Sequence, residues 1–369
     1  MSCSRAWGST GRFVRRCTIR WAGIVVLALR LCHDAGLDRR ASLSDSLRAL
    51  VARRLERGDP SLPARALGAA WGLFGARGVA RPLRLPEGVR LLGVGSAVLG
   101  GAGKTPLAIA LVRALAERGE RPALIGHAYR AHPGHPRVVL PSDAVAEVGD
   151  DALAAARLLA GCSPVIVASH RQDAVDHAAA LGHRVLVADS LLQTSPHRLD
   201  ASILVVDALA PWGSGACPPA GDLRAPRAAL LAAADHVAAI LPEGAVLDPA
   251  LGAIPVPSRL AGALTAAGEL ISLTTLAPLR LGLLVTIARP ARVLAALSLA
   301  GLIPAVTLAL ADHAVPRPRD LATAARAPVD AWLTTARCAT KLPVCVGGAP
   351  VLILDHRLEI GALVAALQP

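Results

Sequence analysis

A glycine-rich loop between an apolar strand and a helix constrains the fold of this chain more than any other feature. The strand is predicted over Val89 to Val94 and the helix over Lys104 to Arg118. Between them the loop closes with Gly100-Gly101-Ala102-Gly103-Lys104-Thr105. Glycines let a backbone turn tightly and point its N–H groups inward, where these groups and the helix N-terminus bind phosphate oxygens. The sequence therefore predicts an α/β protein with a phosphate-binding loop.

The residue types in the loop indicate which phosphate compound it binds. Lys104 would reach the β- and γ-phosphates of a nucleotide, and the Thr105 hydroxyl would be a magnesium ligand. The strict loop pattern has another glycine five residues before Gly103, where this chain has Val98. The order of strand, glycine loop, Lys-Thr and helix is nevertheless retained. We therefore expect ATP and Mg²⁺ as cofactors, with residues 100–105 as the nucleotide-binding segment.

Short apolar strands alternate with amphipathic helices along most of the chain after Val89. This alternation favours a P-loop NTPase-type, mostly parallel sheet with helices on both faces. A segment rich in Pro and Gly, Pro242 to Pro257, marks a boundary. We predict three parts: a basic N-terminal extension over 1–60, a P-loop domain over 61–245, and a smaller C-terminal α/β domain over 246–369 that closes the cleft.

The net charge of +12 favours an anionic partner such as a phosphorylated ligand or a membrane surface. Proteins that bind single-stranded nucleic acid stack bases on aromatic rings, and only 2% of this chain is aromatic. Nucleic acid is therefore not expected as a partner. An arginine-rich composition without any anionic partner explains the charge equally well.

The N-terminal extension has the charge pattern of a membrane-surface segment. Four arginines precede the nine-residue apolar run Trp21 to Leu29, namely Arg12, Arg15, Arg16 and Arg20. The run is too short to span a bilayer. It is consistent with an interfacial helix on anionic lipid, and equally with a start codon placed too early.

The seven cysteines show neither Cys-x-x-Cys nor the spacing of a zinc site. This irregular, odd set is typical of reduced thiols in a cytosolic protein. We expect neither a structural metal nor a disulfide framework.

The segment Val94 to Pro106 resembles the family of tetraacyldisaccharide 4'-kinases, whose loop also lacks the early glycine and has a proline after Lys-Thr. Val148-Gly149-Asp150-Asp151 is similar to the family's Val-Gly-Asp-Glu. Further similar motifs follow in the same order: Cys217-Pro218-Pro219-Ala220-Gly221-Asp222-Leu223-Arg224 for Leu-Pro-Ala-Gly-Pro-Leu-Arg, Ile287-Ala288-Arg289-Pro290, and Asp312-His313. The resemblance spans roughly residues 64–345.

This resemblance implies ATP-dependent phosphorylation of the 4'-hydroxyl of a tetraacyldisaccharide 1-phosphate, the lipid A precursor. The acylated disaccharide lipid and an anionic membrane surface would be partners of a cytoplasmic protein, peripheral on the inner face of the inner membrane. It also implies that Asp150 is the catalytic base, pairs with His313, and acts with Lys104. Taken without the resemblance, N-capping is the alternative for Asp150, and His313 is more often a surface histidine.

The remaining candidate residues bind metal or substrate. Asp189 comes directly after a predicted strand, Arg184 to Ala188, where a metal-associated carboxylate belongs. Thr105, Asp189 and Asp151 are therefore the predicted magnesium ligands. Arg171 and Arg224 are candidate substrate contacts, because a guanidinium grips phosphate oxygens with two parallel hydrogen bonds. A plain surface role for each arginine remains open.

Three blocks depart from the family pattern. Asp189-Ser190-Leu191-Leu192-Gln193-Thr194 stands in place of Asp-Asp-Gly-Phe-Gln-His. Gly126-His127-Ala128-Tyr129-Arg130 replaces Ser-Arg-Gly-Tyr-Gly, and Thr334-Thr335-Ala336-Arg337-Cys338 replaces Thr-Thr-Glu-Lys-Asp. Two alternatives follow: a catalytically impaired homologue that binds nucleotide or lipid, and a P-loop kinase with a different acceptor.

Overall fold

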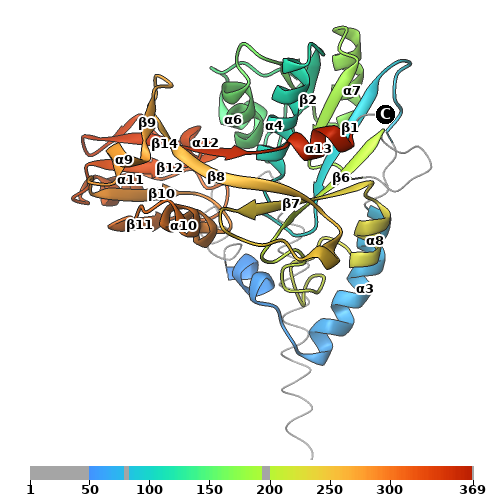
Figure 1. Ribbon diagram of the computed structural model, residues 1–369, viewed down its shortest axis with the longest axis horizontal. Helices are drawn as coiled ribbons and strands as arrows, with labels where there is room; N and C mark the ends of the chain where they lie inside the picture. The colour runs from blue at the N-terminus through green and yellow to red at the C-terminus, as the bar shows by residue number, and fades with distance from the viewer. Residues whose placement is uncertain (1–49, 79–82, 193–199, 368–369) are drawn as a thin grey trace, which may run out of the picture.

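One continuous mixed sheet organises the protein (Figure 1). The computed structural model describes residues 50–78, 83–192 and 200–367. The order along the 14-stranded sheet is β11-β10-β12-β14-β8-β7-β6-β1-β5-β2-β4-β3, with β13 paired to β14 and β9 paired to β8. Most neighbouring pairs are parallel, so the mostly parallel sheet predicted from the alternation is confirmed.

The N-terminal half of the sheet carries the glycine loop. Its strands are β1 (Arg90–Ser96), β2 (Pro122–Ile125), β3 (Arg137–Val138), β4 (Val165–Val167), β5 (Val185–Asp189), β6 (Ala201–Asp207) and β7 (His236–Pro242). Its helices are α4 (Lys104–Glu117), α5 (Val145–Val148), α6 (Asp150–Leu158), α7 (Arg171–Ala180) and α8 (Arg227–Ala232). The strand before the loop and the helix after it lie where the sequence predicts them.

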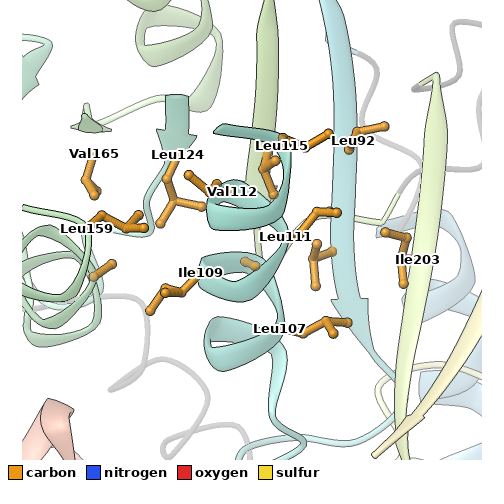
Figure 2. Close-up of a cluster of buried hydrophobic side chains, with 14 of the residues drawn as sticks. Leu92, Leu107, Ile109, Leu111, Val112, Leu115, Leu124, Leu159, Val165 and Ile203 are labelled. Carbon is orange, nitrogen blue, oxygen red and sulfur yellow. The ribbon is translucent and has the colours of Figure 1, made fainter. Parts of the chain in front are cut away.

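Helices cover both faces of this half of the sheet. Successive residues of β1 therefore pack in two different buried clusters, one on each face. Leu92 packs with α4 and α6, whereas Leu91 packs in the cluster of α7 on the opposite face. Figure 2 shows how α4 fits its face: Leu107, Leu111 and Leu115 recur at helical spacing and point toward β1. The glycine loop is thereby anchored at one end by a buried strand and at the other by a helix whose apolar face is buried.

The C-terminal half (residues 254–367) also alternates strands with helices. Its strands are β8 (Ile254–Leu264), β9 (Leu270–Ser272), β10 (Leu281–Val285), β11 (Val306–Ala309), β12 (Ala331–Thr334), β13 (Cys345–Val346) and β14 (Ala349–Leu358). Its helices are α9 (Leu273–Leu276), α10 (Pro290–Leu299), α11 (Pro318–Ala325), α12 (Ala336–Ala339) and α13 (Gly361–Ala366). A short 3₁₀ helix, Pro249–Leu251, precedes it.

The join between the halves differs from the expectation of a loop at the proline-rich segment. Residues 254–257 begin the long strand β8, which pairs in parallel with β7 and antiparallel with β14. Pro255 and Pro257 are tolerated because β14 pairs with β8 only from Ser258 onward. The two halves therefore share one sheet, and the domain boundary at 245 stays a prediction.

A helix before the sheet is attached to the N-terminal half by its glycines. In α3 (Leu62–Gly78), Gly68, Gly72 and Gly75 lie against the backbone and side chains of segment 217–226. A side chain at Gly68 would meet the Cys217 carbonyl oxygen at 2.6 Å. Residues 50–57 form a further helix. Among the described residues, none of the helices has the length and hydrophobicity needed to cross a bilayer; the apolar run Trp21 to Leu29 lies outside them.

Candidate active site

The loop 100–105 has the backbone conformation that phosphate binding requires. Gly101 and Gly103 have φ values of +62° and +85°, which L side chains rarely adopt. Gly103 is the N-cap of α4, so the free N–H groups at the start of this helix face the loop. The predicted combination of strand, glycine turn and helix is present, and the N–H groups at the helix start are placed to bind an anion.

Residues 222–224 pair with residues 97–99, which directly precede the loop. The Leu99 N–H donates to the carbonyl oxygen of Asp222 at 2.9 Å, and Arg224 N–H donates to that of Ala97 at 2.9 Å. Val98 and Leu223 form an antiparallel bridge between these two contacts. The Arg224 side chain is exposed and lines the same cleft as the loop.

The carboxyl end of β5 brings Asp189 next to the loop. Asp189 is 2% exposed and accepts a hydrogen bond from the Thr105 hydroxyl at 2.6 Å. The Arg171 guanidinium donates to the backbone oxygens of Asp189 at 2.6 Å and of Ser190 at 3.2 Å. Thr105 and Asp189 thus place two hard oxygen donors side by side, which suits Mg²⁺. Through its two hydrogen bonds, Arg171 stabilises the backbone at Asp189 and Ser190.

Lys104 is close enough to Asp189 and Asp151 for both carboxylates to act on its charge. Burial lowers the pKa of its ammonium group, while the charges of Asp189 and Asp151 raise it. Burial likewise raises the pKa of the Asp151 carboxyl, with the charge of Arg337 acting against it. Asp151 is 3.8 Å from an Arg337 nitrogen, so its oxygens already face one cation.

Asp150 and His313 meet although 163 residues separate them. Asp150 begins α6 and is 3% exposed, and His313 follows β11 with a left-handed backbone, φ +58°. The imidazole Nδ1 is 2.8 Å from Oδ1 and 2.9 Å from Oδ2 of Asp150. The Tyr129 ring packs on the imidazole at 4.4 Å between centroids. The predicted pair is present in the structure.

Lys341, a residue that the sequence did not single out, also binds Asp150. Its ammonium group forms an ion pair with Oδ2 and is 1% exposed. Burial raises the pKa of the Asp150 carboxyl, but the hydrogen bond with His313 and the charge of Lys341 outweigh it and hold that pKa below its ordinary value. Asp150 is therefore ionised at neutral pH.

Arg337 completes the arrangement on the other side of the imidazole. One of its nitrogens is 3.0 Å from His313 Nε2, and another donates to Asp312 at 2.6 Å. A guanidinium only donates, so Nε2 accepts and the proton of the neutral imidazole is on Nδ1, pointing at Asp150. The carboxylates around Arg337 raise its pKa against the effect of burial.

One signal in the sequence marks Lys341. Only two of the 39 basic Lys and Arg residues are lysines, Lys104 and Lys341, and both lie at this site. An ammonium group is a compact point charge, whereas arginine carries a planar fork. Lysine in such an arginine-rich chain therefore indicates positions that favour a compact ammonium group over a planar guanidinium.

A cleft of about 3100 Å³ connects these groups. The carboxyl ends of strands from both halves line it, as expected for ligand sites of open α/β sheets. The predicted residues that line it are Gly100, Gly101, Ala102, Gly103, Lys104, Thr105, Asp150, Asp151, Arg171, Arg224 and His313, while Asp189 is buried behind Thr105. Gln193 and Thr194 lie outside the described residues.

A parallel sheet with a glycine loop, a Lys-Thr pair at a helix start and a carboxylate on the neighbouring strand defines the class of P-loop phosphotransferases. The sequence model of the family Tetraacyldisaccharide-1-P 4'-kinase matches residues 66–368. The chain belongs to this family. Membership confirms the predicted ATP- and magnesium-dependent 4'-kinase function at the level of the family.

Curated relatives support this assignment over nearly their whole length. The chain is 36% identical over 323 residues to a tetraacyldisaccharide 4'-kinase of Methylobacterium sp. (strain 4-46), covering 84% of this chain and 93% of the relative. It is 35% identical over 320 residues to the enzyme of that name from Methylobacterium nodulans, covering 83% and 90%.

A solved structure of LpxK from Aquifex aeolicus, described as an apo form in complex with ATP, has a similar fold. The TM-score is 0.58 at 17% sequence identity, and the match covers 88% of this chain and 98% of the other. This likeness confirms the predicted fold class.

Proposed function

We propose that the chain transfers the γ-phosphoryl group of ATP to the 4'-hydroxyl of a tetraacyldisaccharide 1-phosphate, using the cleft between its two halves. The observation that carries the proposal is the contact of Asp150 with His313 in the same cleft as the glycine loop. A phosphate cradle and a proton acceptor in one cleft are the two components that phosphoryl transfer to an alcohol requires.

In this proposal the loop residues hold the nucleotide. The backbone N–H groups of 100–105 bind the phosphates, and Lys104 neutralises charge on the transferred group. The oxygens of Thr105 and Asp189 hold magnesium, which when bound supplies charge neutralisation at the β- and γ-phosphates. Asp151 is the third predicted ligand, and it lies within the electrostatic reach of Lys104.

The acceptor side is assigned to Asp150 and His313. The ionised Asp150 takes the proton of the 4'-hydroxyl, and His313 orients the carboxylate through Nδ1–H. Arg224, exposed in the cleft, is the better placed of the two candidate substrate arginines. Two guanidinium nitrogens of Arg171 are engaged by backbone oxygens, so we assign Arg171 to support of the Asp189 turn as well.

The direct test is transfer of labelled phosphate from Mg-ATP to the acylated disaccharide by the purified chain. Labelled lipid product supports the proposal. Nucleotide binding by calorimetry without transfer to any lipid acceptor would instead support the catalytically impaired homologue. Transfer only to another acceptor in a broad screen would support the third interpretation.

The magnesium assignment predicts the behaviour of Thr105→Val. This variant keeps the side-chain shape but removes the hydroxyl that donates to Asp189. We expect the magnesium concentration for half-maximal transfer to rise about tenfold or more, because one hard oxygen ligand is lost. A magnesium titration at saturating ATP measures this. Thr323→Val, which removes a hydroxyl bonded within α11, is the matched control; an unchanged magnesium requirement in Thr105→Val would refute the assignment.

We also propose that α3 and the helix at 50–57 lie on the cytoplasmic face of the inner membrane. These helices expose large apolar side chains to solvent: Leu50, Leu62, Leu67, Trp71 and Leu73. Exposed arginines accompany them at Arg53, Arg57 and Arg65. Apolar side chains beside basic ones are typical of helices at an anionic membrane surface.

The membrane proposal predicts that Leu62→Glu combined with Leu73→Glu weakens vesicle binding. We expect about a tenfold or larger loss of binding to phosphatidylglycerol vesicles, because two apolar contacts are removed and two negative charges added. Cosedimentation measures the bound fraction. Ile303→Glu changes an equally exposed residue of the other half and should leave binding unchanged. Equal binding by both variants would exclude this surface.

A further inference from the structure

The start of α10, in the C-terminal half, contacts the nucleotide loop directly. A Cβ atom on Gly101 would lie 3.2 Å from Cδ and 3.4 Å from Cγ of Arg289, so the stem of this arginine covers the face of the glycine. Arg292 donates a hydrogen bond to the Gly101 carbonyl oxygen and forms an ion pair with Asp207. The loop is thus held from the half that does not contain it.

Asp222 connects this contact to the other wall of the loop. Its carboxylate forms a buried ion pair with Arg289, whose side chain is 8% exposed while that of Asp222 is 3% exposed. The other carboxylate oxygen accepts hydrogen bonds from the N–H and hydroxyl of Ser214, both at 2.8 Å. The backbone oxygen of Asp222 accepts from Leu99, directly before the loop. Asp222 stands where the family pattern has proline, so that pattern does not include this pair.

We propose that Arg289, Arg292 and Asp222 are positioning residues that hold the loop in its ATP-binding conformation. The inference rests on the proposed nucleotide role of the loop. Gly101 has a left-handed backbone with no side chain of its own to fix it, so the adjoining arginine stem and the bond to its carbonyl oxygen define its position. Without them the loop samples other conformations, and ATP affinity falls by the fraction of time that it spends in them.

The same half also carries His313, so the contact couples the two walls of the cleft. His313 follows β11, and its N–H donates to the Thr286 carbonyl oxygen at 3.1 Å, three residues before Arg289. The ion pair of Arg289 with Asp222 therefore helps to fix segment 286–289, to which the backbone of His313 is bonded. The predicted consequence is weaker nucleotide binding when the pair is broken, whether or not an acceptor lipid is present.

Calorimetric titration of the full chain with ATP and magnesium tests this, together with steady-state kinetics. Asp222→Asn keeps an oxygen for Ser214 but turns an amide toward Arg289. We expect the Kd and KM for ATP to rise about tenfold in Asp222→Asn and in Arg289→Met, while the KM for the lipid stays within about twofold. The double variant should be no weaker than either single variant, and Arg289→Lys should recover part of the affinity.

Controls separate positioning from simple loss of folded protein. Arg292→Met removes a partly exposed side chain and should raise the Kd for ATP while thermal unfolding barely changes. Arg90→Met breaks an exposed ion pair with Glu120 at the opposite end of β1 and should change nothing. An unchanged ATP affinity in Arg292→Met and Asp222→Asn, or an equal rise in both KM values, would overturn the proposal. Absence of wild-type transfer with normal ATP binding would contradict only the proposed function.

Discussion

Replacement of Asp150 by asparagine is expected to lower phosphoryl transfer by about 10²- to 10⁴-fold, the range of a lost general base. Asparagine keeps the size of the side chain and can still accept from His313 Nδ1–H, but it cannot take the proton of the acceptor hydroxyl. ATP binding, which we assign to the loop 100–105, should stay within about twofold of wild type. Initial rates at saturating substrates and calorimetric ATP titration measure the two effects.

Folding must be followed in the same variant, because Asp150→Asn leaves the buried Lys341 ammonium without its carboxylate. Removal of one partner of a buried pair costs about 3–5 kcal/mol, so the unfolding temperature should fall. Asp143→Asn, which breaks a 2.6 Å ion pair with Arg137 away from the cleft, is the matched control and should retain turnover. Normal turnover by folded Asp150→Asn would remove Asp150 from the chemical step.

Replacement of Lys104 by methionine should lower transfer by about a thousandfold, because the charge that faces the transferred phosphoryl group is lost. Lys104→Arg should not restore activity. We expect that a planar guanidinium cannot replace the compact ammonium group near Asp189 and Asp151. Complementation of a strain that lacks the lipid kinase gives the cellular readout, with protein level followed by immunoblot.

The matched control for the arginine swap is Arg113→Lys, further along the same helix, where the guanidinium donates a hydrogen bond to the Leu158 carbonyl oxygen. It should complement fully. Growth with Lys104→Arg at wild-type rate would show that charge alone is sufficient at this position, and that the shape argument drawn from the two lysines is wrong.

The sequence by itself determined the glycine loop, because every part of it is local. The strand, the glycine turn, Lys104-Thr105 and the helix follow one another within 30 residues, and hydrogen bonding along the chain fixes their geometry. The alternation of apolar strands and helices was sufficient for the fold class. The family resemblance added Asp150 and His313 as a pair, which neither residue indicated alone.

Only the tertiary structure decided how the two walls of the cleft meet. Arg337 lies in a block that differs from the family pattern, and Lys341 lies just after it. Their link to Asp150 and His313 depends on α12 packing against α6. The prolines at the start of β8 suggested a loop instead of a strand. A strand tolerates them there because β14 pairs with β8 only from Ser258 onward. Contacts such as Arg289 with Asp222 cross 67 residues, and no local periodicity reports them. Local pattern therefore predicted which group binds phosphate, whereas long-range packing set which charges surround the proton acceptor.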